Sequence, residues 1–200
     1  MITHVVKRTL GLAAVVTLAG CTVFPNPEPP RVMDLSVSQP VFQAVVRSDK
    51  TLRVNTPQAS EPFTGTRILA KPTPYEYRVY GKVRWRTTTP VLVRDLLTES
   101  LRASNSFGTV ISDASSAEAD ETLVSEVTAF HTESHGGDTN AVITLHAQIV
   151  DNRSRSILCS RSFSSLERVQ SDDIERVARA FSVAGEILAR DISEWAATCR

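Results

Sequence analysis

ETLVSEVTAFHTESHGGDTNAVITLHAQIVD, residues 121–151, contains two long segments rich in β-branched residues, with a polar, glycine-containing stretch between them. In the second segment, apolar side chains alternate with polar ones: Ile143, Leu145, Ala147 and Ile149. Alternation with a period of two is typical of a half-buried strand. We therefore predict two long strands, joined through SHGGDTN at residues 134–140.

A third strand is predicted to follow these two. DNRSR, residues 151–155, is a turn sequence that leads into SILCSRSF, residues 156–163. Three consecutive strands with short connections indicate an antiparallel meander. His146 lies on the polar side of the second strand, so we interpret it as a hydrogen-bonded strand histidine and not as a catalytic one.

Two amphipathic helices accompany the strands. We predict that one starts at Ser171 as its cap, with Asp172 and Asp173 in the first turn, and runs through Trp195. Its apolar positions are Ile174, Val177, Ala178, Phe181, Ala184, Leu188 and Ile192. The other helix is predicted to begin with Thr89 as cap and Pro90 in the first turn, and to end at 105–108. Its apolar face comprises Leu92, Val93, Leu96, Leu97 and Leu101.

Further strands are expected before the first helix. YEYRVYGKVRW, residues 75–85, alternates in the manner of one half-buried strand. RVMDLSV (31–37), TLRVNTP (51–57) and TRILA (66–70) indicate shorter strands, with a loop, QASEPFTG, at 58–65. The order of elements predicts a single mixed sheet packed by two main helices. The predicted fold class is α/β, with α+β left open. The connection that contains the first helix is a candidate crossover between two parallel strands.

The N-terminus has the features of an export signal. Lys7 and Arg8 precede an apolar run, LGLAAVVTLAG at 10–20. Crossing the hydrocarbon core takes about 20 residues, and a short apolar run behind basic residues is typical of a secretory signal peptide. LAGC, residues 18–21, resembles a bacterial lipobox. That resemblance implies cleavage before Cys21 and its modification with acyl chains such as palmitate, and Thr22 after it favours the outer membrane.

The expected organisation has three parts. Residues 1–20 form the signal peptide, and residues 21–30 form a lipidated tether in which TVFPNPEPP holds four prolines. Residues 31–200 form one domain. The chain has 22 basic and 22 acidic residues, and loss of Lys7 and Arg8 leaves 20 against 22. This balance gives no electrostatic indication of nucleic-acid binding.

Two cysteines remain in the predicted domain. Cys159 lies in the third strand of the meander and Cys199 just past the last helix. Export places both in an oxidising compartment, where a pair usually forms a disulfide. We therefore predict a Cys159–Cys199 bond.

The domain resembles the ABC-type transport auxiliary lipoproteins of the PqiC-like family. The resemblance lies in RILAKPTPYEYRVYGKVRW (67–85), the Leu-rich helix ending in SNSFGTV (104–110), and AFSVAGEILARDISEW (180–195). It implies an anticodon-binding-like fold, similar to the N-terminal part of TolB. It also implies a lipid-anchored protein on the periplasmic face of the outer membrane, beside an MCE-domain protein and an ABC permease and ATPase that move lipids or other hydrophobic molecules. The resemblance leaves the oligomeric state open, including a homo-oligomer.

One stretch of the sequence has the spacing of a possible metal or catalytic site. HTESH, residues 131–135, sets His131 and His135 four apart, with Glu133 and Asp138 nearby. These residues straddle a strand end and a Gly-Gly loop, so we interpret them as a solvated hairpin. No G-x-S-x-G motif or glycine-rich phosphate loop is present in the sequence. We therefore expect no enzyme activity, no metal and no cofactor.

We expect the domain to act by binding a partner. Tyr80, Trp85 and Trp195 are candidate residues of a partner or ligand surface, and residues 56–66 and 131–140 are candidate docking loops. Two alternatives remain: an envelope assembly lipoprotein without a transported ligand, and a metal-dependent envelope hydrolase.

The lipobox makes a direct prediction about Cys21. The native protein is expected to begin at an acylated Cys21, and Cys21→Ala should leave the chain uncleaved by the lipoprotein peptidase and unacylated. Mass spectrometry of the membrane-extracted protein checks both points. An unmodified Cys21, or cleavage at another position, would contradict the assignment.

Overall fold

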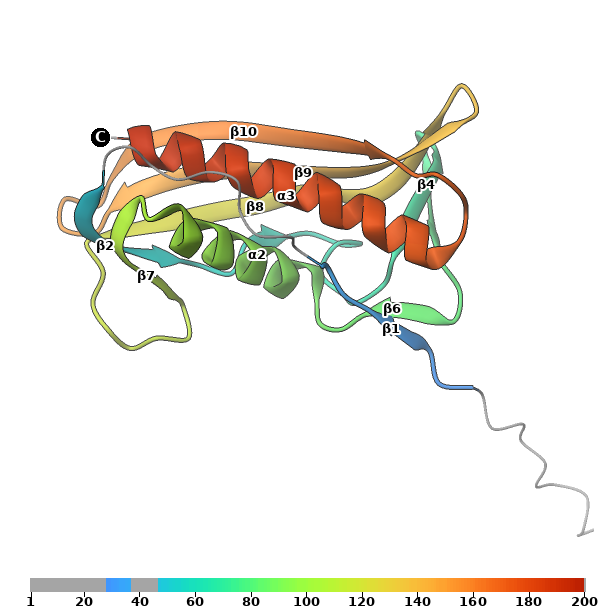
Figure 1. The fold of residues 1–200 in the computed structure, drawn as a ribbon, viewed down its shortest axis with the longest axis horizontal. Helices are drawn as coiled ribbons and strands as arrows, with labels where there is room; N and C mark the ends of the chain where they lie inside the picture. Colours follow the sequence, from blue (N-terminus) through green and yellow to red (C-terminus); the bar gives the residue numbers. More distant parts are fainter. Residues whose placement is uncertain (1–27, 37–46, 200) are drawn as a thin grey trace, which may run out of the picture.

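The computed structural model describes residues 28–36 and 47–199 (Figure 1). The predicted signal peptide, Cys21 and most of the predicted tether lie outside the described residues. The described chain forms a curled mixed sheet with two helices, in the α+β class that the sequence left open.

One side of the sheet is the predicted antiparallel meander. It consists of β8 (Glu121–His135), β9 (Asp138–Asp151) and the edge strand β10 (Ser156–Arg168). The expected seven-residue connection at 134–140 is wrong, because the strands continue into it and His135 pairs with Asp138. Gly136 and Gly137 alone make the turn, with φ values of 60° and 93° that glycine adopts readily.

The other edge of β8 is occupied by three successive parallel strands. They are β2 (Ser48–Val54), β3 (Gln58–Ala59) and β4 (Leu69–Thr73). On its far side β2 pairs in parallel with β7 (Phe107–Ser112), which gives the order β10-β9-β8-β2-β7. The predicted parallel crossover is therefore present, since the chain between β2 and β7 includes the first helix.

Both helices lie on one face of the sheet: α2 (Thr89–Ser104) and α3 (Ile174–Thr198) (Figure 1). The apolar faces predicted for them are turned inward and largely buried. Between α3 and the sheet, the Phe130 and Phe181 rings stack with centroids 4.9 Å apart, and Trp85 meets both edge-on at 5.7 and 5.4 Å. Side chains this large dominate core energetics, so this cluster joins helix to sheet.

The prediction of one strand over 75–85 is wrong. This stretch forms β5 (Glu76–Val79), which pairs with β4, and β6 (Val83–Trp85), which pairs in parallel with β1 (Arg31–Met33). Lys82 between them has a φ of 58°, which breaks the extended backbone. The regular alternation hid two environments, because β5 is exposed along its length whereas Trp85 is fully buried.

Both predicted helix caps are also displaced. The N-cap position of α2 is Thr88, without a side-chain cap bond, and Thr89 is already helical. The N-cap of α3 is Asp173, whose carboxylate accepts a hydrogen bond from the Glu175 backbone N–H at 3.2 Å, and not Ser171. Serine and aspartate both favour the N-cap position, so residue type alone did not distinguish Ser171 from Asp173, which the sequence analysis placed in the first turn.

The capping geometry predicts different costs for two neighbouring substitutions. Asp173→Ala should lower the free energy of unfolding by about 1 kcal/mol, because a helix N–H loses its acceptor. Ser171→Ala, at an exposed position outside the helix, should have little effect. Urea denaturation of both variants checks this, and a larger loss from Ser171→Ala would favour the sequence-based cap instead.

Candidate interaction surface

Three features of the structure gather at the end of the molecule where α3 begins (Figure 1). The first is a projecting hairpin of β4 and β5, residues 69–79, which we name the arm. The second is an aromatic cluster of Phe63, Tyr77 and His131 at the base of the arm. The third is a groove beside the first described residues of the chain.

The aromatic cluster holds the arm against the sheet. The His131 ring stacks on Phe63 at a centroid distance of 6.0 Å, and Tyr77 meets the two rings edge-on at 5.4 and 5.7 Å. Each ring comes from a different segment, since Phe63 follows β3, Tyr77 lies on β5 and His131 on β8. The cluster therefore fixes three distant parts of the chain to one another.

His131 is buried in this cluster, so the predicted solvated hairpin is wrong at this position. Its side chain is 4% exposed, and neither ring nitrogen has a hydrogen-bond partner among the described residues. Burial lowers the pKa of the imidazole, and the nearby Lys71 ammonium lowers that pKa further. The Glu133 carboxylate, 3.7 Å from Nε2, acts in the opposite direction. The neutral ring is therefore the form that the fold favours.

The groove has a volume of about 440 Å³. Its lining residues are Glu28, Pro29, Arg31, Tyr80, Gly81, Lys82, Val83, Asp172, Asp173 and Ile174. The Tyr80 hydroxyl is 3.0 Å from Thr132 Oγ1, and burial raises the pKa of this phenol. Arg31 on one side makes an ion pair with Glu175 on α3. The first described residues are thereby attached to the body at the start of α3.

The three aromatic residues that the sequence suggested as a partner or ligand surface lie in three different environments. Tyr80 lines the groove. Trp85 is fully buried in the core cluster, so its assignment to a surface is wrong. Trp195 is partly buried, and its ring packs against Phe163 with centroids 5.4 Å apart. The three do not form one surface. The sequence singled out tryptophans and missed Tyr75, Tyr77 and Val79, whose exposure on the arm is hidden by strand-like alternation.

The cysteines of the domain are adjacent. In the structure Cys159 on β10 and Cys199 at the end of α3 form a disulfide, with Cα atoms 5.9 Å apart. The bond fastens the last turn of α3 to the edge strand of the sheet.

His146 lies on the sheet face away from the helices. Its ring nitrogens are 3.0 Å from Ser162 Oγ and 3.0 Å from Ser160 Oγ, in agreement with a hydrogen-bonded strand histidine. In the part of the chain that the structure describes, no three His, Cys, Asp or Glu side chains gather closely enough to hold a metal ion. The side chain of His135 lies outside what is described.

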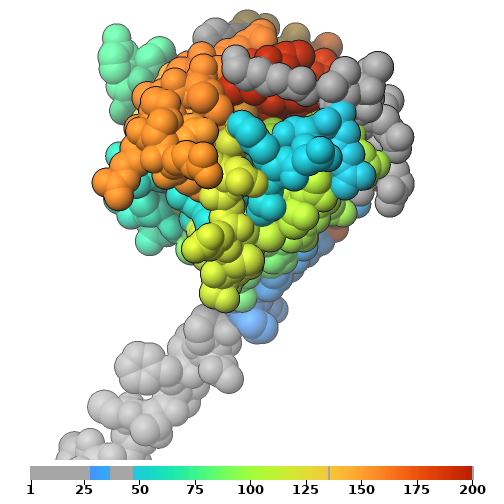
Figure 2. Space-filling view, turned by 90° about the vertical axis from the view of Figure 1, so that its left-hand side faces the viewer, coloured from blue at the N-terminus to red at the C-terminus, as the bar shows by residue number. Residues whose placement is uncertain are grey.

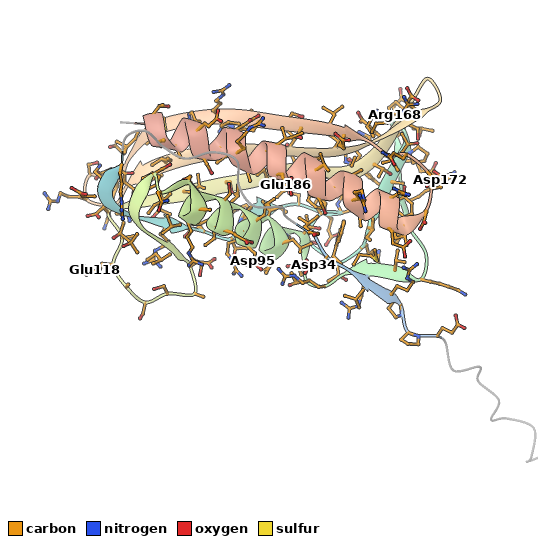
Figure 3. The ribbon with its side chains drawn as sticks, viewed as in Figure 1. Asp34, Asp95, Glu118, Arg168, Asp172 and Glu186 are labelled. Carbon is orange, nitrogen blue, oxygen red and sulfur yellow. A yellow bond between two sulfur atoms is a disulfide. The ribbon has the colours of Figure 1, made fainter. Side chains whose placement is uncertain are left out.

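A second groove, of about 610 Å³, runs along α2. It is lined by Asp95, Thr98, Glu99, Arg102, Ala103 and Ser112. Asp34 and Asp95 are both labelled in Figure 3. Next to the groove, Arg86 donates a hydrogen bond to Asp34 at 2.8 Å and another to Asp95 at 2.9 Å. These salt bridges connect the segment after β1 to α2. Polar side chains dominate the lining, so we assign the groove no apolar ligand.

A family model described as the ABC-type transport auxiliary lipoprotein component matches residues 34–193. The chain belongs to this family. The match extends from the end of β1 nearly to the end of α3, so it includes the arm and both helices. No curated protein matches the chain. Within residues 28–36 and 47–199, neither helix combines the length and hydropathy of a membrane span.

Solved structures share the fold. Protein XCC0632 from Xanthomonas campestris, a member of family DUF330, has a TM-score of 0.78 at 22% identity, over 84% of this chain and 95% of that one. The hypothetical protein CT253 from Chlamydia trachomatis has a TM-score of 0.53 at 10% identity, over 76% and 98%. At these identities the similarity establishes the architecture.

The burial of His131 predicts a pH-dependent stability. Because the folded-state pKa is lowered, the unfolded chain binds a proton more readily, and the free energy of unfolding should fall as the pH drops below about 6.5. His131→Phe keeps a ring in the stack and should remove this part of the pH dependence. Chemical denaturation between pH 7.5 and 5 checks the difference, with His146→Gln, at a half-buried strand position outside the aromatic cluster, as the control.

That control should retain the pH dependence of the wild-type protein. If His131→Phe showed the same dependence as the wild type, the imidazole would not be the group responsible.

The disulfide predicts that no thiols are reactive in the exported domain. Thiol titration of the unfolded, unreduced protein should find none at Cys159 or Cys199, whereas two per chain would rule out the bond. In the chain-entropy model a loop of this length stabilises the fold by roughly 4 kcal/mol, so Cys159→Ser with Cys199→Ser should lower the unfolding midpoint substantially.

Proposed function

We propose that this protein is a lipid-anchored, non-enzymatic auxiliary component of an ABC transport system of the MCE type, which moves lipids or other hydrophobic molecules across the envelope. The observation that carries the proposal is the family match over 34–193. The lipobox at 18–21 adds the means of attachment, and Thr22 favours the outer membrane.

The three-part organisation gives this proposal its geometry. Residues 1–20 are removed, Cys21 carries the acyl chains, and residues 22–30 act as a spacer of about 28 Å if extended as polyproline. The acyl chains together anchor the protein stably, as a single chain would not. The folded domain is thereby held close to one membrane, where it docks onto the periplasmic part of the transporter, through its MCE-domain protein.

Partner binding fits the chemistry of the His131 region better than hydrolysis does. The imidazole packs against Phe63 and Tyr77, and its side chain is only 4% exposed, so both ring nitrogens are enclosed by the same domain. A metal-dependent hydrolase would need these nitrogens to reach a metal or a water. In the structure, His131 instead packs in the aromatic cluster that holds the arm against the sheet.

Genetic epistasis tests the proposal. Deleting this protein and inactivating the transporter's ATPase should give the same sensitivity to membrane-perturbing agents, and the double mutant should be no more sensitive than either. Cells that carry Cys21→Ala should show part or all of the same sensitivity, because the variant lacks the acyl chains that anchor the protein. The MCE-domain protein should co-purify with the wild type after mild solubilisation.

Additive defects in the double mutant, without co-purification, would favour an envelope assembly lipoprotein that serves no transporter. A defect reproduced by His131→Phe in a folded, abundant protein would instead support chemistry at that histidine.

A further inference from the structure

The arm exposes aromatic and aliphatic surface to solvent. Tyr75 at its tip is 97% exposed, Tyr77 is 40% exposed and Val79 is 48% exposed. Figure 2 shows the arm, in blue-green at the upper left, standing clear of the body. A tyrosine that contacts almost nothing within its own domain contributes little to the stability of the fold, so its ring is available for contacts outside the domain.

The arm has an apolar and a charged side. Tyr77 and Val79 are two residues apart on β5 and therefore project from one face, while Glu76 and Arg78 project from the other. The Arg78 guanidinium donates to the Glu76 carboxylate through Nε at 2.8 Å, so the charged side is internally neutralised. Within β5 itself, the side that carries Tyr77 and Val79 has no charged side chain.

The arm is also held in one orientation. Tyr77 is fixed by the Phe63 and His131 rings, and the Lys71 ammonium lies 5.5 Å from the centre of the Tyr77 ring. Pro72 and Pro74 restrict the backbone on the way to the tip. A preformed hairpin loses little conformational entropy when its tip is immobilised.

The position of the arm relative to the N-terminus suggests what it meets. Three residues, 80–82, join β5 to β6, and Val83 of β6 pairs with Arg31. At about 3.4 Å per residue, Tyr75 cannot lie more than roughly 27 Å from Val83. The segment between Cys21 and Arg31 spans about 28 Å when extended. The tip of the arm and the acyl chains on Cys21 can therefore reach the same bilayer.

The size of the exposed patch favours a membrane over a protein partner. Two partly or fully exposed tyrosines and one valine offer on the order of 400 Å², about half of what one side of a stable protein interface buries. A domain already held at a membrane by lipid needs no large area, because its effective local concentration is high. Tyrosine is also enriched at membrane–water interfaces, where the ring is apolar and the hydroxyl stays hydrated.

We propose that the tip of the arm, centred on Tyr75 with Tyr77 and Val79 behind it, inserts into the headgroup region of the bilayer that holds the Cys21 lipid. The inference rests on the proposed lipid anchoring. It assigns the domain a defined orientation, with two points of attachment to the membrane.

The test places a fluorophore at the tip. Full-length, acylated protein carrying Tyr75→Trp is reconstituted in vesicles of phosphatidylethanolamine and phosphatidylglycerol with brominated acyl chains. The matched control is Ile157→Trp, since Ile157 is 56% exposed near the start of β10, next to the turn after β9. Wild-type protein supplies the background from Trp85 and Trp195, and flotation with mass spectrometry verifies attachment through Cys21.

The expected result for Tyr75→Trp is an emission shift to shorter wavelength and bromine quenching of the added indole, with neither change for Ile157→Trp. A floating Tyr75→Trp protein whose added indole stays unquenched and accessible to acrylamide would overturn the arm proposal and leave the lipid anchor intact. Shielding of that indole only when the transporter's periplasmic component is added would also overturn it, in favour of a protein contact. A protein that is not acylated at Cys21 would refute the anchoring itself.

Discussion

Hydrogen bonding along both edges of β8 is the constraint on which the rest of this structure depends. One edge pairs with β9 from end to end, and the other receives β2, β3 and β4 in turn. The segments between those three short strands are consequently held against the sheet. The segment between β3 and β4 brings Phe63 against His131, and β4 itself forms one strand of the arm. The features at the α3 end of the domain thus follow from how a single long strand is shared.

A bulge in β8 decides which side chains enter the core. The pairing with β9 shifts between Val127 and Ala129, so Val127 and Phe130 both face the helices although they are three residues apart. Phe130 can therefore meet Phe181 and Trp85, and His131 turns to the opposite face. Strict alternation through this segment would have excluded Phe130 from that position, so the bulge accounts for both the aromatic core and the unusual site of the histidine.

The sequence predicts what depends on repeated local patterns. The meander, the two helices with their buried faces and the mixed sheet all follow from periods of two and of about 3.6 residues. The sequence does not reveal the break at Lys82, because the same alternation of apolar and polar residues fits both a strand that ends in a core residue such as Trp85 and an exposed strand. The burial of His131 depends on Phe63, which is distant in the sequence, and no local pattern carries that information. Ser171 and Asp173, two residues apart, are both residue types that favour the N-cap position, and the path of the chain makes Asp173 the cap.

The parallel pairing of β2 with β8 has a consequence for the order in which the domain assembles. Thr51 and Asp120, at the start of this pairing, are 69 residues apart, whereas β8 and β9 are joined by a two-residue turn. Closing the shorter loop costs less chain entropy, so the meander is the natural nucleus and β2, with β7 outside it, adds later. Until then one edge of β8 is open to any extended chain nearby. The most aggregation-prone species of this protein is therefore a half-assembled one, whose vulnerable surface is the edge that the native fold covers with its own N-terminal strands.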